Sequence, residues 1–221
     1  MEPTALPRVK ICCIASISEA WTAIRYGASA VGLVSEMPSG PGPIDEALIA
    51  EIARQLPPAI GSFLLTSRQD AAEIIAQQKR CGVNTIQLCD RLVSGSYADL
   101  RAAMPGVALV QVIHVTGWEA LDEARAVAPH VNGILLDSGR PSLPVKELGG
   151  TGRTHDWAIS RRIREEVDVP VFLAGGLRPD NVAEAIRQVR PYGVDVCTGV
   201  RTNGVLDEGK LAAFFHSVRS V

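Results

Sequence analysis

Short apolar segments rich in β-branched residues alternate with amphipathic segments along this chain. The apolar segments have the length and composition of buried strands, and the segments between them repeat apolar residues at helical spacing. The predicted strands are residues 8–14, 30–34, 60–65, 85–88, 107–113, 131–136, 169–174 and 194–197. The predicted helices are residues 16–26, 44–56, 69–80, 97–104, 118–128, 156–166, 179–189 and 208–218.

Eight alternating strand–helix units in a chain of 221 residues predict an α/β protein, a single (β/α)8 barrel (TIM barrel) that spans residues 1–221. An open doubly wound sheet is the alternative, but such sheets more often stop at about five or six strands. A (β/α)8 barrel places its chemistry at the carboxyl ends of its strands. The residues predicted there are Cys12, Cys13, Cys89, His114, Asp137, Gly175, Gly176 and residues 197–199.

Two glycines, Gly175 and Gly176, end the seventh predicted strand, and Pro179 and Asn181 open the helix that follows. Glycines let a backbone approach a ligand closely, and N–H groups near a helix N-terminus suit a dianionic phosphate. An ordinary strand-to-helix turn is the alternative, because glycine-rich turns are common. Since the loops after strands seven and eight are the frequent phosphate site of this barrel, we predict that these glycines bind a phosphate.

Cys12 and Asp137 lie at the ends of the first and sixth predicted strands, near opposite sides of the predicted barrel mouth. A thiol and a carboxyl group that face one another can serve as base and acid in moving a proton on a sugar phosphate. The carboxylate of Asp137 directly follows the apolar residues 134–136, where burial without a task or a partner is costly. For Cys12 the alternative is a small buried hydrophobic residue.

Cys89 and Cys197 also end predicted strands. Together with Cys12 and either Asp137 or His114, they leave open a zinc site assembled from separate strands. No two of these residues have the close spacing typical of metal ligands. The five cysteines include no CxxC pair, which argues against a disulfide framework and fits a reducing compartment.

Charge and hydropathy argue against several other classes of protein. The net charge is −2 with acidic and basic residues mixed along the chain, whereas a nucleic-acid-binding protein needs a concentrated basic face. No apolar run approaches the roughly 18 residues that span a bilayer, and residues 1–8 lack the pattern of a signal peptide. We therefore expect a cytoplasmic protein with no nucleic-acid or membrane partner.

Several segments, in the same order along nearly the whole chain, resemble phosphoribosylanthranilate isomerase, a (β/α)8-barrel family of tryptophan biosynthesis. The most specific are Gly-Gly-Thr-Gly followed by Asp-Trp in residues 149–157, and Ala-Gly-Gly-Leu-x-Pro-x-Asn-Val in residues 174–182. Shorter matches are residues 9–12, 85–88, 135–137 and 194–200.

The resemblance implies an Amadori rearrangement of a small phosphosugar, from N-(5-phosphoribosyl)anthranilate to 1-(2-carboxyphenylamino)-1-deoxyribulose 5-phosphate. It implies that Asp137 is the general acid on the ribose ring oxygen and that Cys12 is the general base that removes the C2 proton. No metal or organic cofactor is implied, and family members occur as monomers and homodimers. The implied substrate-binding residues are Gln87, Cys89, Gly150 and Asp195, and the implied phosphate-binding residues are Gly175, Gly176, Cys197, Thr198 and Gly199.

The chain departs from the family pattern at several positions. The family's loop after the second strand usually carries an arginine that binds the anthranilate carboxylate, but residues 37–43 include no basic residue. Losing such a partner typically costs about 2 kcal/mol or more of binding. A second hypothesis is therefore a barrel of the same family that acts on, or only binds, a different phosphosugar. The other departures are Cys13, Ala15, Cys89, Asp90, Cys197 and Arg201.

Two features near the predicted mouth bear on this choice. Arg91 and Arg140 are the candidates to replace the absent arginine from neighbouring loops. Residues 138–154 form a loop far longer than the roughly two to six residues usual between a strand and a helix. Because loops of that length tend to be functional, we expect this one to cover the site.

Overall fold

Eight parallel strands close into a barrel in which each strand pairs with its neighbours in the chain and β8 pairs with β1. This computed structural model describes residues 6–221, so residues 1–5 of the stretch expected to lack a signal peptide lie outside the described residues. The strands are β1 (Arg8–Ile11), β2 (Ala30–Val34), β3 (Gly61–Thr66), β4 (Thr85–Leu88), β5 (Ala108–His114), β6 (Gly133–Asp137), β7 (Val171–Leu173) and β8 (Gly193–Val196). The predicted (β/α)8 barrel is confirmed.

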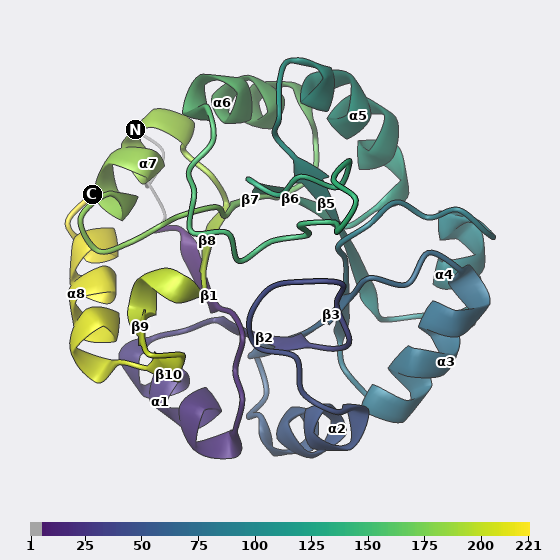
Figure 1. Cartoon of the computed structure of the whole chain (residues 1–221), viewed down its shortest axis with the longest axis horizontal. Coiled ribbons are helices and arrows are strands. Elements are labelled where there is room, and N and C mark those ends of the chain that lie inside the picture. Colours follow the sequence, from purple (N-terminus) through teal and green to yellow (C-terminus); the bar gives the residue numbers. More distant parts are fainter. Residues whose placement is uncertain (1–5) are drawn as a thin grey trace.

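Helices follow the strands and form a ring around the barrel (Figure 1). They are α1 (Ile17–Tyr26), α2 (Glu46–Gln55), α3 (Ala71–Cys81), α4 (Tyr97–Ala103), α5 (Glu119–Val127), α6 (Trp157–Glu166), α7 (Val182–Val189) and α8 (Glu208–Arg219). Capping side chains set several N-termini: Ser16 accepts a hydrogen bond from the Glu19 amide at 3.1 Å. No helix formed by residues 6–221 is long and apolar enough to cross a membrane.

The first strand is shorter than the sequence predicts. Residues 8–14 read as one apolar strand, but β1 ends at Ile11. Cys13 has a φ of 61°, a left-handed conformation that an extended strand cannot contain. The chain therefore turns directly after Cys12, and both thiols stay at the barrel mouth.

Strand side chains alternate between the outside and the inside of the barrel. Those that point outward, such as Ile11 and Leu64, pack with the helices in the main apolar core. Those that point inward include Phe63, which packs in a second cluster, and Lys10, which has no exposed surface. Lys10 lies opposite Asp195 in the β1–β8 pairing and forms an ion pair with it at 2.9 Å. This alternation carries polar side chains into the barrel interior.

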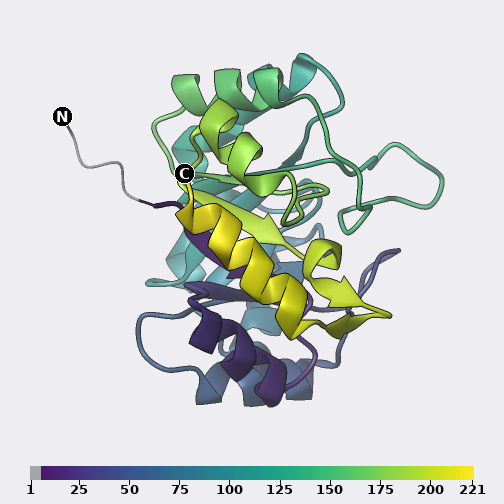
Figure 2. The same cartoon turned by 90° about the vertical axis from the view of Figure 1, so that its left-hand side faces the viewer.

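A short hairpin after β8 was not predicted. It consists of β9 (Arg201–Thr202) and β10 (Val205–Leu206), which pair antiparallel at the mouth of the barrel (Figure 2). The turn contains Asn203 and Gly204, both with positive φ, and Asn-Gly is the sequence signal of such a turn. The Asn-Gly pair is visible in the sequence, but each of the two strands beside it is only two residues long.

Candidate active site

The loops at the carboxyl ends of the strands enclose a cavity at one end of the barrel. Its empty space is about 680 Å³, which includes open solvent at the mouth. His114 and Gly199 do not line it, whereas the other predicted catalytic, substrate-binding and phosphate-binding residues do, namely Cys12, Gln87, Cys89, Asp137, Gly150, Gly175, Gly176, Asp195, Cys197 and Thr198.

Asp137 ends β6 with its carboxyl group in this cavity. Its Oδ1 accepts a hydrogen bond from the Ser138 amide at 2.7 Å. A Cβ atom on Gly149 would lie 2.8 Å from Oδ2, so only glycine lets the loop pass this close to the carboxyl group. Burial raises the pKa of Asp137, while the Ser138 hydrogen bond opposes that rise. A carboxyl group with a raised pKa keeps its proton to higher pH and is suited to act as an acid.

The pKa of Cys12 is shifted in the opposite direction, below the ordinary value of a thiol. A hydrogen bond from the Cys13 thiol lowers its pKa, burial opposes this, and the Lys10 ammonium lowers the pKa further. Burial alone would lower the pKa of Lys10, but Asp195 and Cys12 outweigh burial and raise it, so the ammonium keeps its charge. A thiol with a lowered pKa is more often the thiolate, which is the basic form. Cys12 is thereby suited to accept a proton.

Arg201 holds the turn that carries Cys12. Its guanidinium donates hydrogen bonds to the Cys12 carbonyl at 3.3 Å and to the Cys13 carbonyl at 2.5 Å. The same side chain pairs with Glu19 at 3.0 Å and is almost fully buried. Arg201, which departs from the family pattern, is therefore accommodated by a carboxylate partner and by two backbone carbonyl acceptors.

Gln87 and Asp195 bring unpaired polar atoms to the cavity wall. Gln87 Oε1 and Asp195 Oδ1 are buried and have no hydrogen-bond partner among the described residues. Gln87 Nε2 donates to the sulfur of Cys89 at 3.8 Å. Burial raises the pKa of Cys89, so that thiol stays neutral. Because buried polar atoms are costly unless paired, these two oxygens are suited to accept hydrogen bonds from sugar hydroxyl groups.

The two turns predicted to bind phosphate lie against each other after β7 and β8. The Asn181 side chain folds the first turn by donating to the Gly176 carbonyl at 3.0 Å. Gly176 has a φ of 61°, and a Cβ atom there would lie 2.5 Å from the carbonyl carbon of Arg153. Gly199 lies against the Leu177 carbonyl instead of the cavity, where a Cβ atom would approach the oxygen to 2.0 Å. Because glycine has no side chain, Gly199 lets the two turns pack closely.

The loop of residues 138–156, between β6 and α6, extends beyond the barrel on the mouth side (Figure 2). The Ser39 hydroxyl, in the β2–α2 loop, donates to the Lys146 carbonyl at 2.7 Å. The Lys146 ammonium forms an ion pair with Asp90, in the β4–α4 loop. The long loop is thus joined to two other loops of the mouth, as expected of a segment that covers the site.

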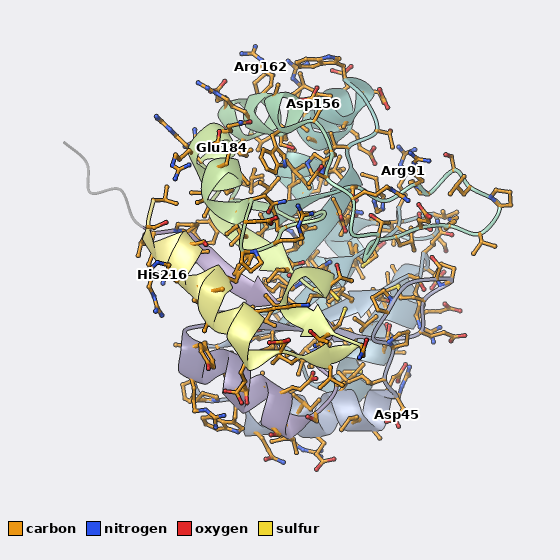
Figure 3. All side chains as sticks on the ribbon, turned by 60° about the vertical axis from the view of Figure 1, so that its left-hand side comes forward. Asp45, Arg91, Asp156, Arg162, Glu184 and His216 are labelled. Carbon is orange, nitrogen blue, oxygen red and sulfur yellow. The ribbon has the colours of Figure 1, made fainter. Side chains whose placement is uncertain are left out.

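Arg91 and Arg140, the candidates to replace the family's arginine, do not line the cavity. Arg91 donates to both carboxylate oxygens of Glu123 at 2.9 Å, and Figure 3 shows its side chain at the outside of the molecule. Arg140 is exposed, and its backbone amide donates to the Glu147 carbonyl at 2.8 Å. Neither residue brings a cation to the cavity in this structure.

The zinc alternative gains no geometric support. Within residues 6–221, no three His, Cys, Asp or Glu side chains are grouped so that they could hold a metal ion. Cys12, Cys89, Cys197 and Asp137 line the cavity without forming such a group, and the Nε2 atom of His114 lies 3.0 Å from the Cys89 carbonyl oxygen.

Further lining residues come from loops and were not predicted. Met37 and Ser39 belong to the β2–α2 loop, and Leu148 and Thr151 belong to the β6–α6 loop. The unusual length of the second loop was the available signal, but length does not indicate which side chains turn inward. A contact between loops this far apart in the sequence leaves no local pattern.

Comparison with known proteins agrees with this geometry. Residues 9–217 match the family described as N-(5'-phosphoribosyl)anthranilate (PRA) isomerase. A Methanosarcina mazei relative named N-(5'-phosphoribosyl)anthranilate isomerase 2 is 38% identical over 215 aligned residues, covering 96% of this chain and 94% of the relative. The crystal structure of phosphoribosyl anthranilate isomerase from Thermotoga maritima superposes with a TM-score of 0.81 at 27% identity, covering 97% of this chain and 100% of that one.

A second solved phosphoribosyl anthranilate isomerase holds reduced 1-(o-carboxyphenylamino)-1-deoxyribulose 5-phosphate. It superposes with a TM-score of 0.78 at 25% identity, covering 97% of this chain and 100% of that one. The family match and the relative both extend over nearly the whole barrel, including every strand end that lines the cavity. The chain therefore belongs to the phosphoribosylanthranilate isomerase family.

Proposed function

We propose that this protein catalyses the isomerisation of N-(5-phosphoribosyl)anthranilate to 1-(2-carboxyphenylamino)-1-deoxyribulose 5-phosphate, a step of tryptophan biosynthesis. The match over residues 9–217 favours this reaction over a barrel that acts on, or only binds, a different phosphosugar. We further propose that residues 1–221 act as one barrel domain, as a monomer or a homodimer, in the cytoplasm. The reaction is an internal transfer of protons and uses no cofactor.

Asp137 acts first, as the general acid. It donates its proton to the ring oxygen of the phosphoribosyl group, and the bond from C1 to that oxygen breaks. The ring oxygen becomes the hydroxyl on C4, and the nitrogen lone pair forms a C1–N iminium. The raised pKa that burial gives Asp137 supports this role, because the acid must still hold its proton when the substrate binds.

Cys12 acts second, as the general base. Its thiolate removes the proton from C2, which the adjacent iminium makes acidic, and an enolamine forms. C1 then takes up one proton while the O2 hydroxyl loses one, which leaves a ketone at C2 and a secondary amine at C1. The proton on the Cys12 thiol and the empty Asp137 carboxylate can supply and accept these protons, so both residues end in their starting states.

The remaining lining residues position the substrate. Gln87, Cys89, Gly150 and Asp195 contact the sugar, while Gly175, Gly176, Cys197 and Thr198 hold the phosphate through the two turns, with Gly199 fixing their packing. Backbone N–H groups in such turns bind a dianion without bringing a side-chain cation close to the reacting carbon atoms.

The observation that carries this proposal is the opposite protonation preference of two side chains in one cavity, Asp137 with a raised pKa and Cys12 with a lowered pKa. The test is the loss of anthranilate-type fluorescence when the purified protein meets freshly generated phosphoribosylanthranilate. We expect Cys12→Ala and Asp137→Asn each to lower kcat by about 1,000-fold or more with the circular dichroism spectrum unchanged. Near-normal turnover in either folded variant would contradict the assigned roles.

A further inference from the structure

The cavity lacks a cation for the carboxylate of the proposed substrate. Among residues 6–221, no lysine, arginine or histidine lines it, and two carboxyl groups do, those of Asp137 and Asp195. The β2–α2 loop, residues 37–43, supplies no basic residue. A substrate carboxylate buried beside these groups without a positive partner would be strongly disfavoured.

The basic residues nearest the cavity are mostly engaged elsewhere. Lys10 lies inside the barrel in its ion pair with Asp195, and it does not reach the lining. Arg201 is held by Glu19 and by backbone carbonyls behind the Cys12 turn. Such side chains cannot leave without exposing a buried charge or unpaired backbone groups.

Lys146 is placed differently, at the rim of the cavity. Its backbone carbonyl accepts the Ser39 hydroxyl at 2.7 Å, and Ser39 lines the cavity. Leu148, two residues further along the same loop, also lines it. The ammonium pairs with Asp90, which directly follows the lining residue Cys89. Both ends of Lys146 are therefore fixed to walls of the mouth.

A second hollow beside Lys146 borders the main cavity at Cys89, which lines both. Its lining also includes Asp90 and Arg91, whose guanidinium is paired with Glu123. An aromatic ring bound against Cys89 would lie next to this hollow. Its rim holds a half-buried ammonium group, whose side chain is 37% exposed.

The barrel order places this hollow away from the phosphate. The phosphate turns follow β7 and β8, whereas Cys89 and Asp90 follow β4, which lies across the barrel from β8 (Figure 1). A substrate held by its phosphate at β7 and β8 and by its reacting carbon atoms between Cys12 and Asp137 extends its third part towards β4. For the proposed substrate that part is the anthranilate ring.

We propose that Lys146, oriented by Asp90, binds the carboxylate of the anthranilate group in place of the absent loop arginine. This inference rests on the proposed isomerase function. An ammonium group has three donors, and Asp90 engages only part of them. The remaining donors face the substrate carboxylate, and Asp90 keeps the ammonium at the rim when no substrate is bound. Lys146 is thus the specificity-determining residue for an aromatic amine that carries an ortho carboxylate.

The test compares two ligands that differ by one carboxylate. The first is reduced 1-(o-carboxyphenylamino)-1-deoxyribulose 5-phosphate, and the second is its phenylamino counterpart without the carboxylate. Calorimetry measures the Kd of each for the wild-type protein and for Lys146→Met, which keeps the stem and removes the charge. Lys79→Met, an exposed lysine on α3, is the matched control.

We expect Lys146→Met to weaken the carboxylated ligand by about 10- to 100-fold and the ligand without the carboxylate by less than about twofold. Lys146→Arg should keep most of the preference, and Lys79→Met should change neither Kd. Equal weakening of both ligands, or an unchanged preference for the carboxylated one, would overturn the role of Lys146.

The same proteins separate this inference from the function on which it rests. If the wild-type protein turns over phosphoribosylanthranilate but Lys146→Met keeps its carboxylate preference, the inference fails and the function stands. If the wild-type protein shows no turnover, the proposed function fails, and the ligand comparison still decides whether Lys146 recognises a carboxylate.

Discussion

The two ends of the cavity are built in different ways. At the phosphate end, two glycine turns after β7 and β8 present backbone, and the Asn181 side chain folds the first of them. At the other end, side chains from distant loops meet: Ser39 and Asp90 both hold Lys146. One end is encoded within residues 174–200, whereas the other requires three loops to come together.

This difference determines which end of the cavity tolerates amino-acid substitutions. A backbone turn tolerates few substitutions, because its geometry depends on residues that have no side chain to clash. An end made of side-chain pairs can exchange one cation for another on a different loop while the barrel stays the same. The departures from the family pattern that concern the aglycone, such as residues 37–43 and Cys89, fall at this second end.

Breaking the backbone end should have the largest effect. In Gly176→Ala the new Cβ atom would lie 2.5 Å from the carbonyl carbon of Arg153, so the turn must open. We expect kcat/KM to fall by about 100-fold and binding of inorganic phosphate to weaken in parallel. Steady-state kinetics and calorimetry measure the two effects.

The control for that substitution is Gly106→Ala, which has a positive φ of 86° and nothing within 4 Å of the new atom. It carries the same backbone strain without the clash, and it should leave kcat/KM unchanged. Equal losses in Gly106→Ala and Gly176→Ala would mean that strain, and not the phosphate turn, sets the effect.

The sequence predicts the phosphate end of the cavity better than the other end, because the phosphate end is built from local turns and the other end from contacts between distant loops. Alternating strands and helices predict the barrel, and the resemblance to the family implies that Gln87 and Asp195 line the cavity. The Ser39–Lys146 contact spans 107 residues and the Lys146–Asp90 pair spans 56, so neither leaves a local pattern. Arg91 and Arg140 were reasonable candidates by position in the chain, but loop conformation directs them away from the cavity.

Removing the Arg201 side chain, which supports the turn that carries Cys12, should lower the stability of the protein more than it changes substrate specificity. In Arg201→Met, Glu19 loses its ion-pair partner, and the Cys12 and Cys13 carbonyls lose a donor. We expect the free energy of unfolding to fall by about 2 kcal/mol, measured by urea denaturation. Arg187→Met, which breaks an exposed pair with Glu184, should cost less than about 0.5 kcal/mol. Similar costs for the two variants would show that Arg201 is no support.

Removing the Cys13 thiol, which lies next to the general base Cys12, should shift the pH profile of kcat/KM. It should change the maximal rate less. The Cys13 thiol donates to Cys12 and lowers the pKa of Cys12, so Cys13→Ala should raise that pKa. The base is active when deprotonated, so the part of the kcat/KM profile that Cys12 controls should move to higher pH. At a pH within that part of the profile, kcat/KM of Cys13→Ala should be lower than that of the wild-type protein.

The limb set by Asp137 should stay in place, because burial and the Ser138 amide determine its raised pKa and neither changes in Cys13→Ala. Above that limb Asp137 loses its proton and activity falls in both proteins. A Cys13→Ala profile that superposes on the wild-type profile would remove Cys13 from the control of Cys12.

The smallest expected effect comes from removing Arg91, a cation that lines the same hollow as Lys146 but is paired with Glu123. Arg91 shares the β4–α4 loop with Asp90, but its guanidinium is paired with Glu123 and its side chain is 74% exposed. Arg91→Met should therefore change KM for phosphoribosylanthranilate by less than about twofold and stability by less than about 1 kcal/mol. A rise in KM as large as that expected from losing Lys146 would mean that the side-chain end of the cavity rearranges when substrate binds, and that its cation comes from Arg91.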